Sequence, residues 1–180
     1  MLAAFNQSLF AFFFAIGNSS GFAQTLTVFF AEWFPYLVII SIIPYESFRQ
    51  GSTRAIVRTI ISTSVVLIFT WLIAISLKHY FPSPRPFAYF SSIIPLVSES
   101  DAFGSFPSAH ATMFGALAGI AYADKFPIRH WYLAAAVIIA IARVCAGVHW
   151  PVDVIVGGFF GFGLAYLLTT LALTRSRSIK

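Results

Sequence analysis

The chain has 180 residues, of which 59% are hydrophobic and only 9% are charged. Soluble domains contain roughly 25% charged residues, and disordered chains combine low hydrophobicity with high charge, so this composition excludes both classes. The net charge of +5 comes from cations that lie between apolar runs, which favours a role in membrane topology over nucleic-acid binding. The one cysteine, Cys145, excludes an intrachain disulfide framework and a multi-cysteine metal site.

Five apolar segments approach the length of about 20 residues that a helix needs to cross a bilayer. They are residues 25–44, 55–77, 108–123, 131–148 and 154–174. A sixth segment, Leu2–Gly17, is short for a span and is predicted to lie in the membrane interface or to be partly inserted. No basic region precedes it, so no signal peptide is predicted. The sequence therefore predicts an all-α integral membrane protein, a bundle of about six helices forming a single domain over residues 1–180.

The cations divide unevenly when the five spans alternate across the membrane. One side receives Arg49, Arg54, Arg58, Lys125, Arg129, Arg175, Arg177 and Lys180. The other side receives only Lys78, Arg85 and Arg143. Because cytoplasmic loops carry the excess of cations, the first side and the C-terminus are predicted to be cytoplasmic. The three remaining cations then face outward and need a local reason to be there.

The connections on the outer side carry the chemistry-bearing residues. The longer one, residues 78–107, is rich in Pro and Ser, and the shorter one covers residues 147–151. Two histidines and an aspartate flank the same connections: His110, His149 and Asp153. Arg offers a planar fork of donors that matches phosphate oxygens, and Lys offers a compact point charge. The sequence therefore predicts a pocket for a phosphate-bearing ligand at this end of the bundle.

Two helix starts organise this pocket. Ser108 stands where an N-cap belongs, so its hydroxyl and the free N–H groups of the following turn form an anion site. His110 lies in that turn and can protonate a leaving oxygen. Pro151 suits the first helical position, which places Asp153 in the first turn, where it can reach back to His149. A bond to one ring nitrogen would leave the other nitrogen free as a nucleophile.

These residues form three motifs that resemble the signature of the type 2 phosphatidic acid phosphatase superfamily. The signature reads Lys-x6-Arg-Pro, Pro-Ser-Gly-His and Ser-Arg-x5-His-x3-Asp. The matching residues are Lys78, Arg85 and Pro86, then Pro107, Ser108 and His110, then Arg143, His149 and Asp153. Ala109 replaces the Gly of the second motif, and Ala142 replaces the Ser of the third.

The resemblance implies a membrane-embedded lipid phosphatase that needs neither metal nor cofactor. His149 would be the nucleophile that forms a phosphohistidine, Asp153 its orienting partner, and His110 the general acid. The groups that would bind the phosphoryl oxygens are Lys78, Arg85, Ser108, Ala109 and Arg143. Ala109 keeps the backbone N–H that contacts phosphate, whereas Ala142 lacks one hydroxyl that could do so.

Within the superfamily, the chain most resembles the bacterial undecaprenyl pyrophosphate phosphatases. The similar runs are Asn6-Gln7, Ala31-Glu32-Trp33, Pro35-Tyr36-Leu37, residues 105–110 and residues 149–153. This implies release of the terminal phosphate of undecaprenyl diphosphate at the outer face of the bacterial inner membrane, to recycle the lipid carrier of the cell wall. Phosphatidylglycerophosphate, phosphatidic acid or lipid A 1-phosphate as substrate, and a non-catalytic phospholipid binder or transporter, stay open as alternatives. The sequence does not indicate an oligomeric state.

Other polar and small residues have no assigned role in this site. Glu32 lies roughly 10 Å into the first span at 1.5 Å per residue, where it either serves the pocket or forms a buried structural ion pair. Glu99 and Asp101 are interpreted as solvated loop charges rather than as groups that attract a cation of the substrate. Small-residue stripes that are predicted to let helices pack closely are Gly115 with Gly119, and Gly157 with Gly161.

Overall fold

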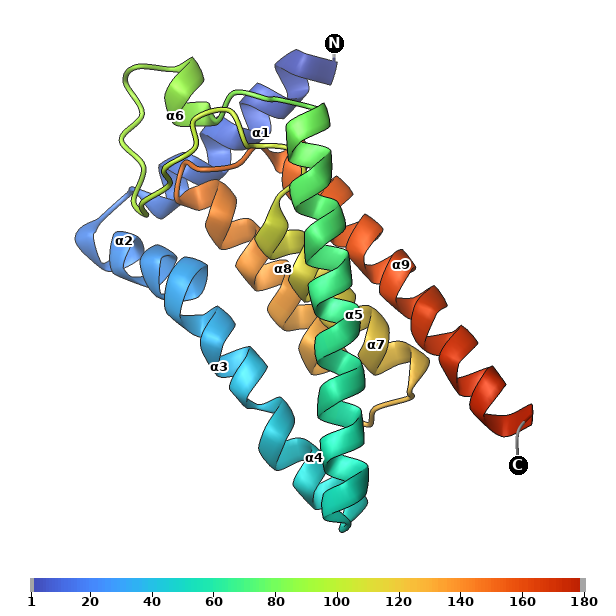
Figure 1. Ribbon diagram of the computed structural model, residues 1–180. Helices are drawn as coiled ribbons and strands as arrows, with labels where there is room; N and C mark the ends of the chain where they lie inside the picture. Colours follow the sequence, from blue (N-terminus) through green and yellow to red (C-terminus); the bar gives the residue numbers. More distant parts are fainter. Residues whose placement is uncertain (1, 179–180) are drawn as a thin grey trace.

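The structure, a computed structural model, describes residues 2–178 apart from the side chains of residues 47, 50 and 176–178. Its helices are α1 (Leu2–Gly17), α2 (Gly21–Val28), a π-helical turn (Phe29–Trp33), α3 (Phe34–Ile40), α4 (Ile42–Gln50), α5 (Thr53–Tyr80), α6 (Pro86–Tyr89), α7 (Ala109–Ala123), α8 (Arg129–Cys145) and α9 (Pro151–Ser178). The predicted all-α bundle is confirmed (Figure 1). Two cations of the predicted cytoplasmic set, Lys180 and the side chain of Arg177, lie outside the described residues.

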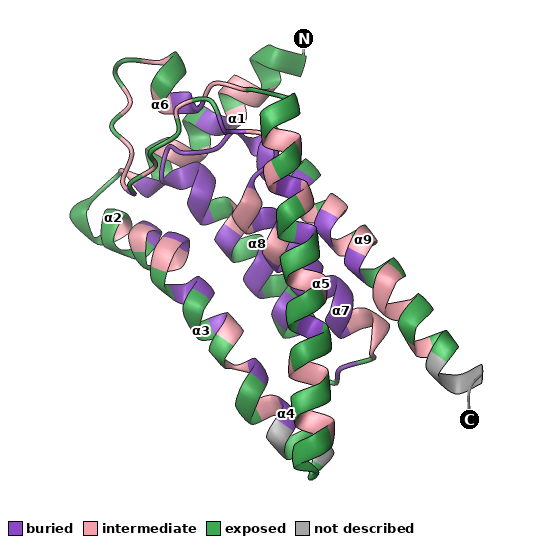
Figure 2. Ribbon diagram, viewed as in Figure 1, coloured by how far each residue is buried: buried purple, intermediate pink, exposed green. Residues whose placement is uncertain are grey.

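In the described part of the chain, three helical stretches are long and apolar enough to cross a membrane, namely Gly21–Glu46, Thr53–Tyr80 and Pro151–Arg175. They correspond to the first, second and fifth predicted spans. The third and fourth predicted spans are α7 and α8, which have 15 and 17 residues and so fall short of the length of a typical span. Other helices enclose α7, which is buried along most of its length (Figure 2). Its length is therefore set by packing against protein rather than by the thickness of the lipid.

The first span is irregular because of Pro35. Proline has no N–H, and its ring clashes with the carbonyl group four residues earlier, here that of Ala31. The helix accommodates the ring with the π-helical turn, in which the Phe34 N–H bonds to the Phe29 carbonyl five residues back. Glu32 lies in this turn and is half-buried.

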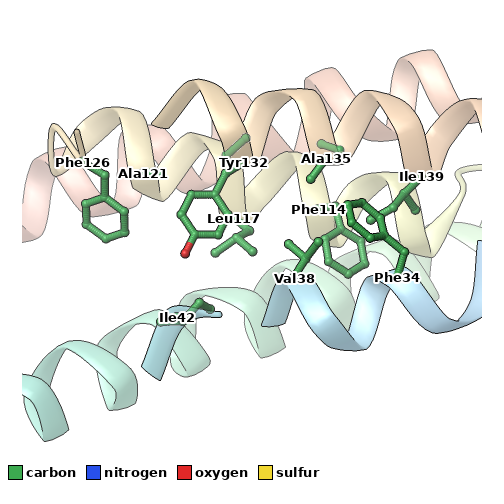
Figure 3. Packing of buried hydrophobic residues seen from close by; sticks show 12 residues of the cluster. Phe34, Val38, Ile42, Phe114, Leu117, Ala121, Phe126, Tyr132, Ala135 and Ile139 are labelled. Atoms are coloured by element: carbon green, nitrogen blue, oxygen red, sulfur yellow. The ribbon is translucent and has the colours of Figure 1, made fainter. Parts of the chain in front are cut away.

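The main hydrophobic core lies where α3 packs against α7 and α8 (Figure 3). Phe34 and Val38 from α3 belong to the same buried cluster as Phe114 and Leu117 from α7 and Ile139 from α8. Interiors of this kind are close-packed and resist relative movement of the helices. The core therefore fixes the start of α7 relative to the end of α8, the two places where the candidate site is built.

Small residues bring α7 and α9 together. A Cβ atom would overlap a carbonyl oxygen across the α7–α9 contact at four positions: Gly115 against Gly158, Gly119 against Phe162, Gly157 against Ser108, and Gly161 against Thr112. The predicted close packing of the glycine stripes is confirmed at these positions. The Ser108 N–H also donates to the Asp153 carbonyl oxygen at 3.2 Å, so the first turns of α7 and α9 lie side by side.

The described members of the two predicted sets of cations lie at opposite ends of the bundle (Figure 1). The α4–α5 turn, the α7–α8 turn and the last part of α9 form one end, which carries the larger set. The other end combines α6, the end of α5, the end of α8, and the starts of α7 and α9. Lys78, Arg85 and Arg143 belong to this second end, as the sequence indicated.

Candidate active site

The three cations of the second end come from three separate elements. Lys78 lies in the last turn of α5, Arg85 caps α6, and Arg143 lies in the last turn of α8. Arg85 and Arg143 are only 3% and 2% exposed, and buried charges need partners. Arg85 donates from Nε to the Asp101 carbonyl at 2.7 Å and from Nη1 to the Val148 carbonyl at 2.9 Å. Lys78 Nζ donates to the Gly104 carbonyl oxygen at 2.5 Å.

Glu99 lies between the two guanidinium groups. Its Oε2 accepts from Arg85 Nη2 at 3.0 Å, and its Oε1 accepts from Arg143 Nη2. The interpretation of Glu99 as a solvated loop charge is therefore wrong. The error arises because Glu99 belongs to a long connection without helix or strand, whose path follows no sequence periodicity. Arg143 Nε is buried and has no hydrogen-bond partner among the described residues, so one donor of the site stays unused.

His149 is buried with a charged group near each ring nitrogen. Its Nε2 lies 3.2 Å from Arg85 Nη1, and its Nδ1 lies 3.7 Å from Asp153 Oδ2. Arginine carries donors only, so Nε2 must be the accepting nitrogen and the proton sits on Nδ1, toward Asp153. The sequence predicted that one ring nitrogen, not specified, would bond to Asp153. The predicted hydrogen bond to Asp153 is not formed, however, because 3.7 Å exceeds hydrogen-bonding distance.

Asp153 is held by other donors instead. Its Oδ2 accepts from the Ser105 hydroxyl at 2.5 Å and from the Trp150 N–H at 2.9 Å. The sequence predicted that Asp153, an acid in the first turn of α9, would reach back to a preceding residue. It does so, but the donor is the Trp150 N–H rather than His149. Sequence reasoning assigned no role in the site to Ser105, which it included only in the run of residues 105–110 that resembles the undecaprenyl pyrophosphate phosphatases.

Burial lowers the pKa of His149 well below its ordinary value, and the positive charges of Arg143 and Arg85 lower this pKa further. The imidazole is therefore neutral at neutral pH, and its Nε2 keeps a lone pair. Burial also lowers the pKa of Arg85, whereas Glu99 and Asp101 raise it. The ordinary pKa of arginine lies far above neutral pH, so the guanidinium stays charged.

The start of α7 supplies the remaining predicted residues. Ser108 is the N-cap, as predicted, and its Oγ accepts from the Ala111 N–H at 3.4 Å. Ala109 opens the helix, so its N–H has no acceptor within the helix. His110 lies in the same turn, close enough to Arg143, Lys78 and Arg85 for their charges to act on it. The eight predicted site residues thus gather at one end of the bundle.

An apolar cavity of about 500 Å³ adjoins this end. It lies between α1, α7, α8 and α9 and is lined almost entirely by apolar side chains. Ala111, Val144 and Pro151 line it and lie within two residues of His110, Arg143 and His149, respectively. The cavity extends to Tyr122 near the far end of α7. Polar and apolar binding surfaces therefore meet at the candidate site.

A family model described as the PAP2 superfamily matches residues 55–177. The chain belongs to the PAP2 superfamily. The match covers well over half of the chain and includes all eight predicted site residues. The resemblance drawn from the three motifs is confirmed.

Relatives within the PAP2 superfamily carry several names. The chain is 30% identical over 166 residues to the Escherichia coli protein named "Putative undecaprenyl-diphosphatase YbjG", which covers 87% of this chain and 77% of that one. It is 37% identical over 114 residues to the lipid A 1-phosphatase of Rhizobium johnstonii, covering 61% of this chain and 46% of that one. The crystal structure of a transmembrane PAP2 type phosphatidylglycerolphosphate phosphatase from Bacillus subtilis superposes with a TM-score of 0.65 at 22% identity, covering 99% and 88% of the two chains. That likeness shows the fold, that of a membrane-spanning PAP2 protein.

Two features of this PAP2 site stay as predictions. Among residues 2–178, no group of three His, Cys, Asp or Glu side chains is placed to hold a metal ion, and whether activity needs a metal is a question for experiment. Glu32 makes no ion pair within the described part of the chain, although its carboxylate interacts electrostatically with Arg143.

Proposed function

We propose that this PAP2 protein hydrolyses a lipid diphosphate, with undecaprenyl diphosphate as the preferred substrate, to the lipid monophosphate and inorganic phosphate. One observation carries the proposal: a buried, neutral His149 presents its Nε2 beside Lys78, Arg85 and Arg143. Phosphoryl transfer needs mainly positioning and stabilisation of charge, and three cations around one nucleophilic nitrogen supply both. A protein that only bound lipid would not need a histidine in a fixed tautomer.

The proposed reaction has two steps. In the first, the substrate phosphate takes over the Arg85 N–H that Nε2 accepts in the empty site, so the Nε2 lone pair can attack the terminal phosphorus. The bond from phosphorus to the bridging oxygen breaks, and a protonated His110 gives its proton to the leaving lipid phosphate. In the second, water attacks the phosphohistidine while His110 accepts a proton, and inorganic phosphate leaves. Asp153 faces Nδ1–H and stabilises the positive charge that the ring gains.

The phosphoryl oxygens are bound by groups that are already close together. Arg143 Nε is buried without a partner among the described residues, so a phosphoryl oxygen would give it the acceptor that it lacks. Lys78, Arg85 and the free Ala109 N–H at the start of α7 complete the set, and the Ser108 hydroxyl keeps a donor proton while its oxygen caps the helix. No metal ion is part of the proposed mechanism.

The apolar cavity supports a lipid as the substrate, because a hydrocarbon tail can occupy it while the phosphate stays among the cations. The relative named as an undecaprenyl-diphosphatase favours an isoprenoid tail. A second candidate, a lipid A 1-phosphate, is favoured by the relative of that name, whose identity is higher over a shorter region.

We also propose an orientation in the bacterial inner membrane. The catalytic end would face the periplasm or cell exterior, and the C-terminus would be cytoplasmic. The separation of the cations into a large set at one end and the site residues at the other supports this orientation.

The proposal is tested by phosphate release from purified full-length protein in detergent. The panel contains undecaprenyl diphosphate, phosphatidylglycerophosphate, phosphatidic acid and lipid A 1-phosphate, and kcat/KM is expected to be highest for the first. The His149→Ala variant should release no phosphate, whereas His79→Ala, an exposed histidine one residue beyond Lys78, should resemble the wild type. Activity should persist in excess EDTA. An active His149→Ala variant, or activity that EDTA abolishes and a divalent metal restores, would overturn the mechanism.

A further inference from the structure

Glu99 takes up donors that a phosphoryl group would need. The Arg85 guanidinium has five N–H donors, and the structure gives it four acceptors: the Asp101 carbonyl, the Val148 carbonyl, His149 Nε2 and Glu99. Glu99 also accepts from Arg143. A phosphoryl group that bridges Arg85 and Arg143 through the N–H groups that Glu99 now occupies must therefore take the position of its carboxylate.

The surroundings of Glu99 allow such an exchange. Its side chain is 21% exposed, whereas those of Arg85 and Arg143 are 3% and 2% exposed, so the carboxylate lies on the open side of the two guanidinium groups. The loop backbone is anchored on both sides of Glu99: the Leu96 N–H donates to the Ala146 carbonyl at 3.0 Å, and the Asp101 carbonyl accepts from Arg85. A change of side-chain rotamer therefore suffices to remove the carboxylate, and no helix has to move.

We propose that Glu99 is a specificity-determining residue, an internal competitor for the phosphoryl site that sets the minimum negative charge of a productive ligand. The inference rests on the proposed phosphatase function and names what that site selects. A carboxylate carries one negative charge, so a ligand with a single charge gains little by displacing it. A phosphate monoester or diphosphate carries more charge and displaces it. The site then rejects the phosphodiester headgroups of ordinary membrane lipids, which surround the protein in large excess.

The test measures binding of inorganic phosphate to the full-length protein in detergent by calorimetry, at a pH where phosphate is mostly dianionic. Glu99→Gln removes the competing charge and keeps the side-chain size. The dissociation constant is expected to fall about tenfold, a conservative value for one charge-assisted hydrogen bond. Asp101→Asn is the matched control, because its carboxylate accepts from the Phe103 N–H in the same loop and touches neither guanidinium group. Its charge acts on Arg85 only from a distance, so the dissociation constant should change by no more than about twofold.

The opposite result identifies a different role. If Glu99→Gln binds phosphate no more tightly than the wild type, Glu99 is a fixed support of the two arginines and the inference is overturned. An equal gain in Asp101→Asn overturns it too, because loop charge rather than direct contact would then be responsible. Should Glu99→Gln fail to fold, Glu99→Asp serves instead: its shorter side chain cannot reach both arginines, so binding should again tighten.

A second measurement tests selectivity against phosphodiesters. Phosphatidylglycerol added to the detergent micelles should leave wild-type phosphate binding unchanged and should weaken it in Glu99→Gln. Equal sensitivity of both proteins contradicts the inference. Neither measurement needs turnover, so the role of Glu99 and the proposed phosphatase function can each be refuted without the other. If no lipid phosphate is hydrolysed but Glu99→Gln still binds phosphate more tightly, the proposed function fails and the role of Glu99 stands.

Discussion

Replacing Asp153 with Asn tests whether its carboxylate stabilises a positively charged His149 during phosphoryl transfer. Asp153 Oδ2 lies 3.7 Å from His149 Nδ1, and both side chains are 2% exposed. At this separation, and with an effective dielectric constant of about 20, two unit charges interact by about 4.5 kcal/mol. Each 1.36 kcal/mol corresponds to a tenfold change in rate. The variant is therefore expected to lower kcat by about 1,000-fold.

The Asn side chain should leave the local structure in place. Its amide oxygen can still accept from the Ser105 hydroxyl and the Trp150 N–H, the two bonds that hold the carboxylate. KM should change little, because the cations that bind phosphate are untouched. The assay is steady-state phosphate release with kcat and KM determined separately, together with rapid-quench trapping of the phosphohistidine, whose formation should slow in parallel with kcat.

The control makes the same substitution at the far end of the bundle. Asp124 pairs with Arg49 near the surface, where an ion pair contributes little, so Asp124→Asn should retain wild-type kcat. A kcat of Asp153→Asn within tenfold of the wild type would refute the electrostatic role of Asp153. A loss of kcat matched by loss of folded protein would also refute it, since the effect would then be structural.

Three further outcomes follow from packing, the cavity and burial. Gly161→Ala should lower the free energy of unfolding by about 1–3 kcal/mol, because its Cβ would overlap the backbone of α7. Gly163→Ala is the control and should leave the stability unchanged, because its Cβ meets no atom within 4 Å. The two variants are compared by their melting temperatures in detergent. Ala140→Phe should fill the apolar cavity and lower kcat/KM for a long-chain lipid about tenfold, but leave kcat/KM for a short phosphate ester unchanged. A tenfold loss corresponds to the free energy of burying about two methylene groups. Ile138→Phe, on an exposed side of the same helix, is its control, and an equal loss with both esters would contradict the tail site. Burial lowers the pKa of His149, so below about pH 6.5 the imidazole is protonated in the unfolded chain but not in the folded one. The melting temperature should therefore fall as the pH drops below this value, and it should fall less steeply in His149→Gln.

Much of the fold could be predicted because lipid imposes simple rules on sequence. Long apolar runs predicted the helices, and the glycine stripes predicted the close approach of α7 and α9 that the backbone shows at Gly115, Gly119 and Gly161. The length of α7 could not be predicted in this way, because other helices enclose it and it does not have to match the bilayer. The π-helical turn was not predicted either. Pro35 indicated an interruption of the helix, but not which backbone geometry would accommodate the proline ring.

The candidate site was predictable as far as its residues lie next to helix ends. Ser108, His149 and Asp153 lie at or just before the first turns of α7 and α9. The geometry of a first turn is regular, so the spacing of these residues in the sequence was enough to predict where they lie. Glu99 and Ser105 lie in the irregular connection before α7, and no periodicity indicates which way their side chains point. The distance between His149 and Asp153 was missed for a related reason, because Ser105 provides Asp153 with a donor that the spacing does not reveal.

The charge balance of the site explains why a loop acid would be placed between two arginines. Lys78, Arg85 and Arg143 bring three positive charges, and Asp153 and Glu99 bring two negative ones, so these five groups carry a net charge of +1 without substrate. If a dianionic phosphate replaces Glu99, the site becomes neutral, whereas a monoanionic phosphodiester leaves the net charge at +1. In a buried site of low dielectric constant, this difference favours the dianion strongly. Removing Glu99 would raise the charge of the empty site to +2, and a monoanion would then be attracted as well, which is the loss of selectivity expected for Glu99→Gln.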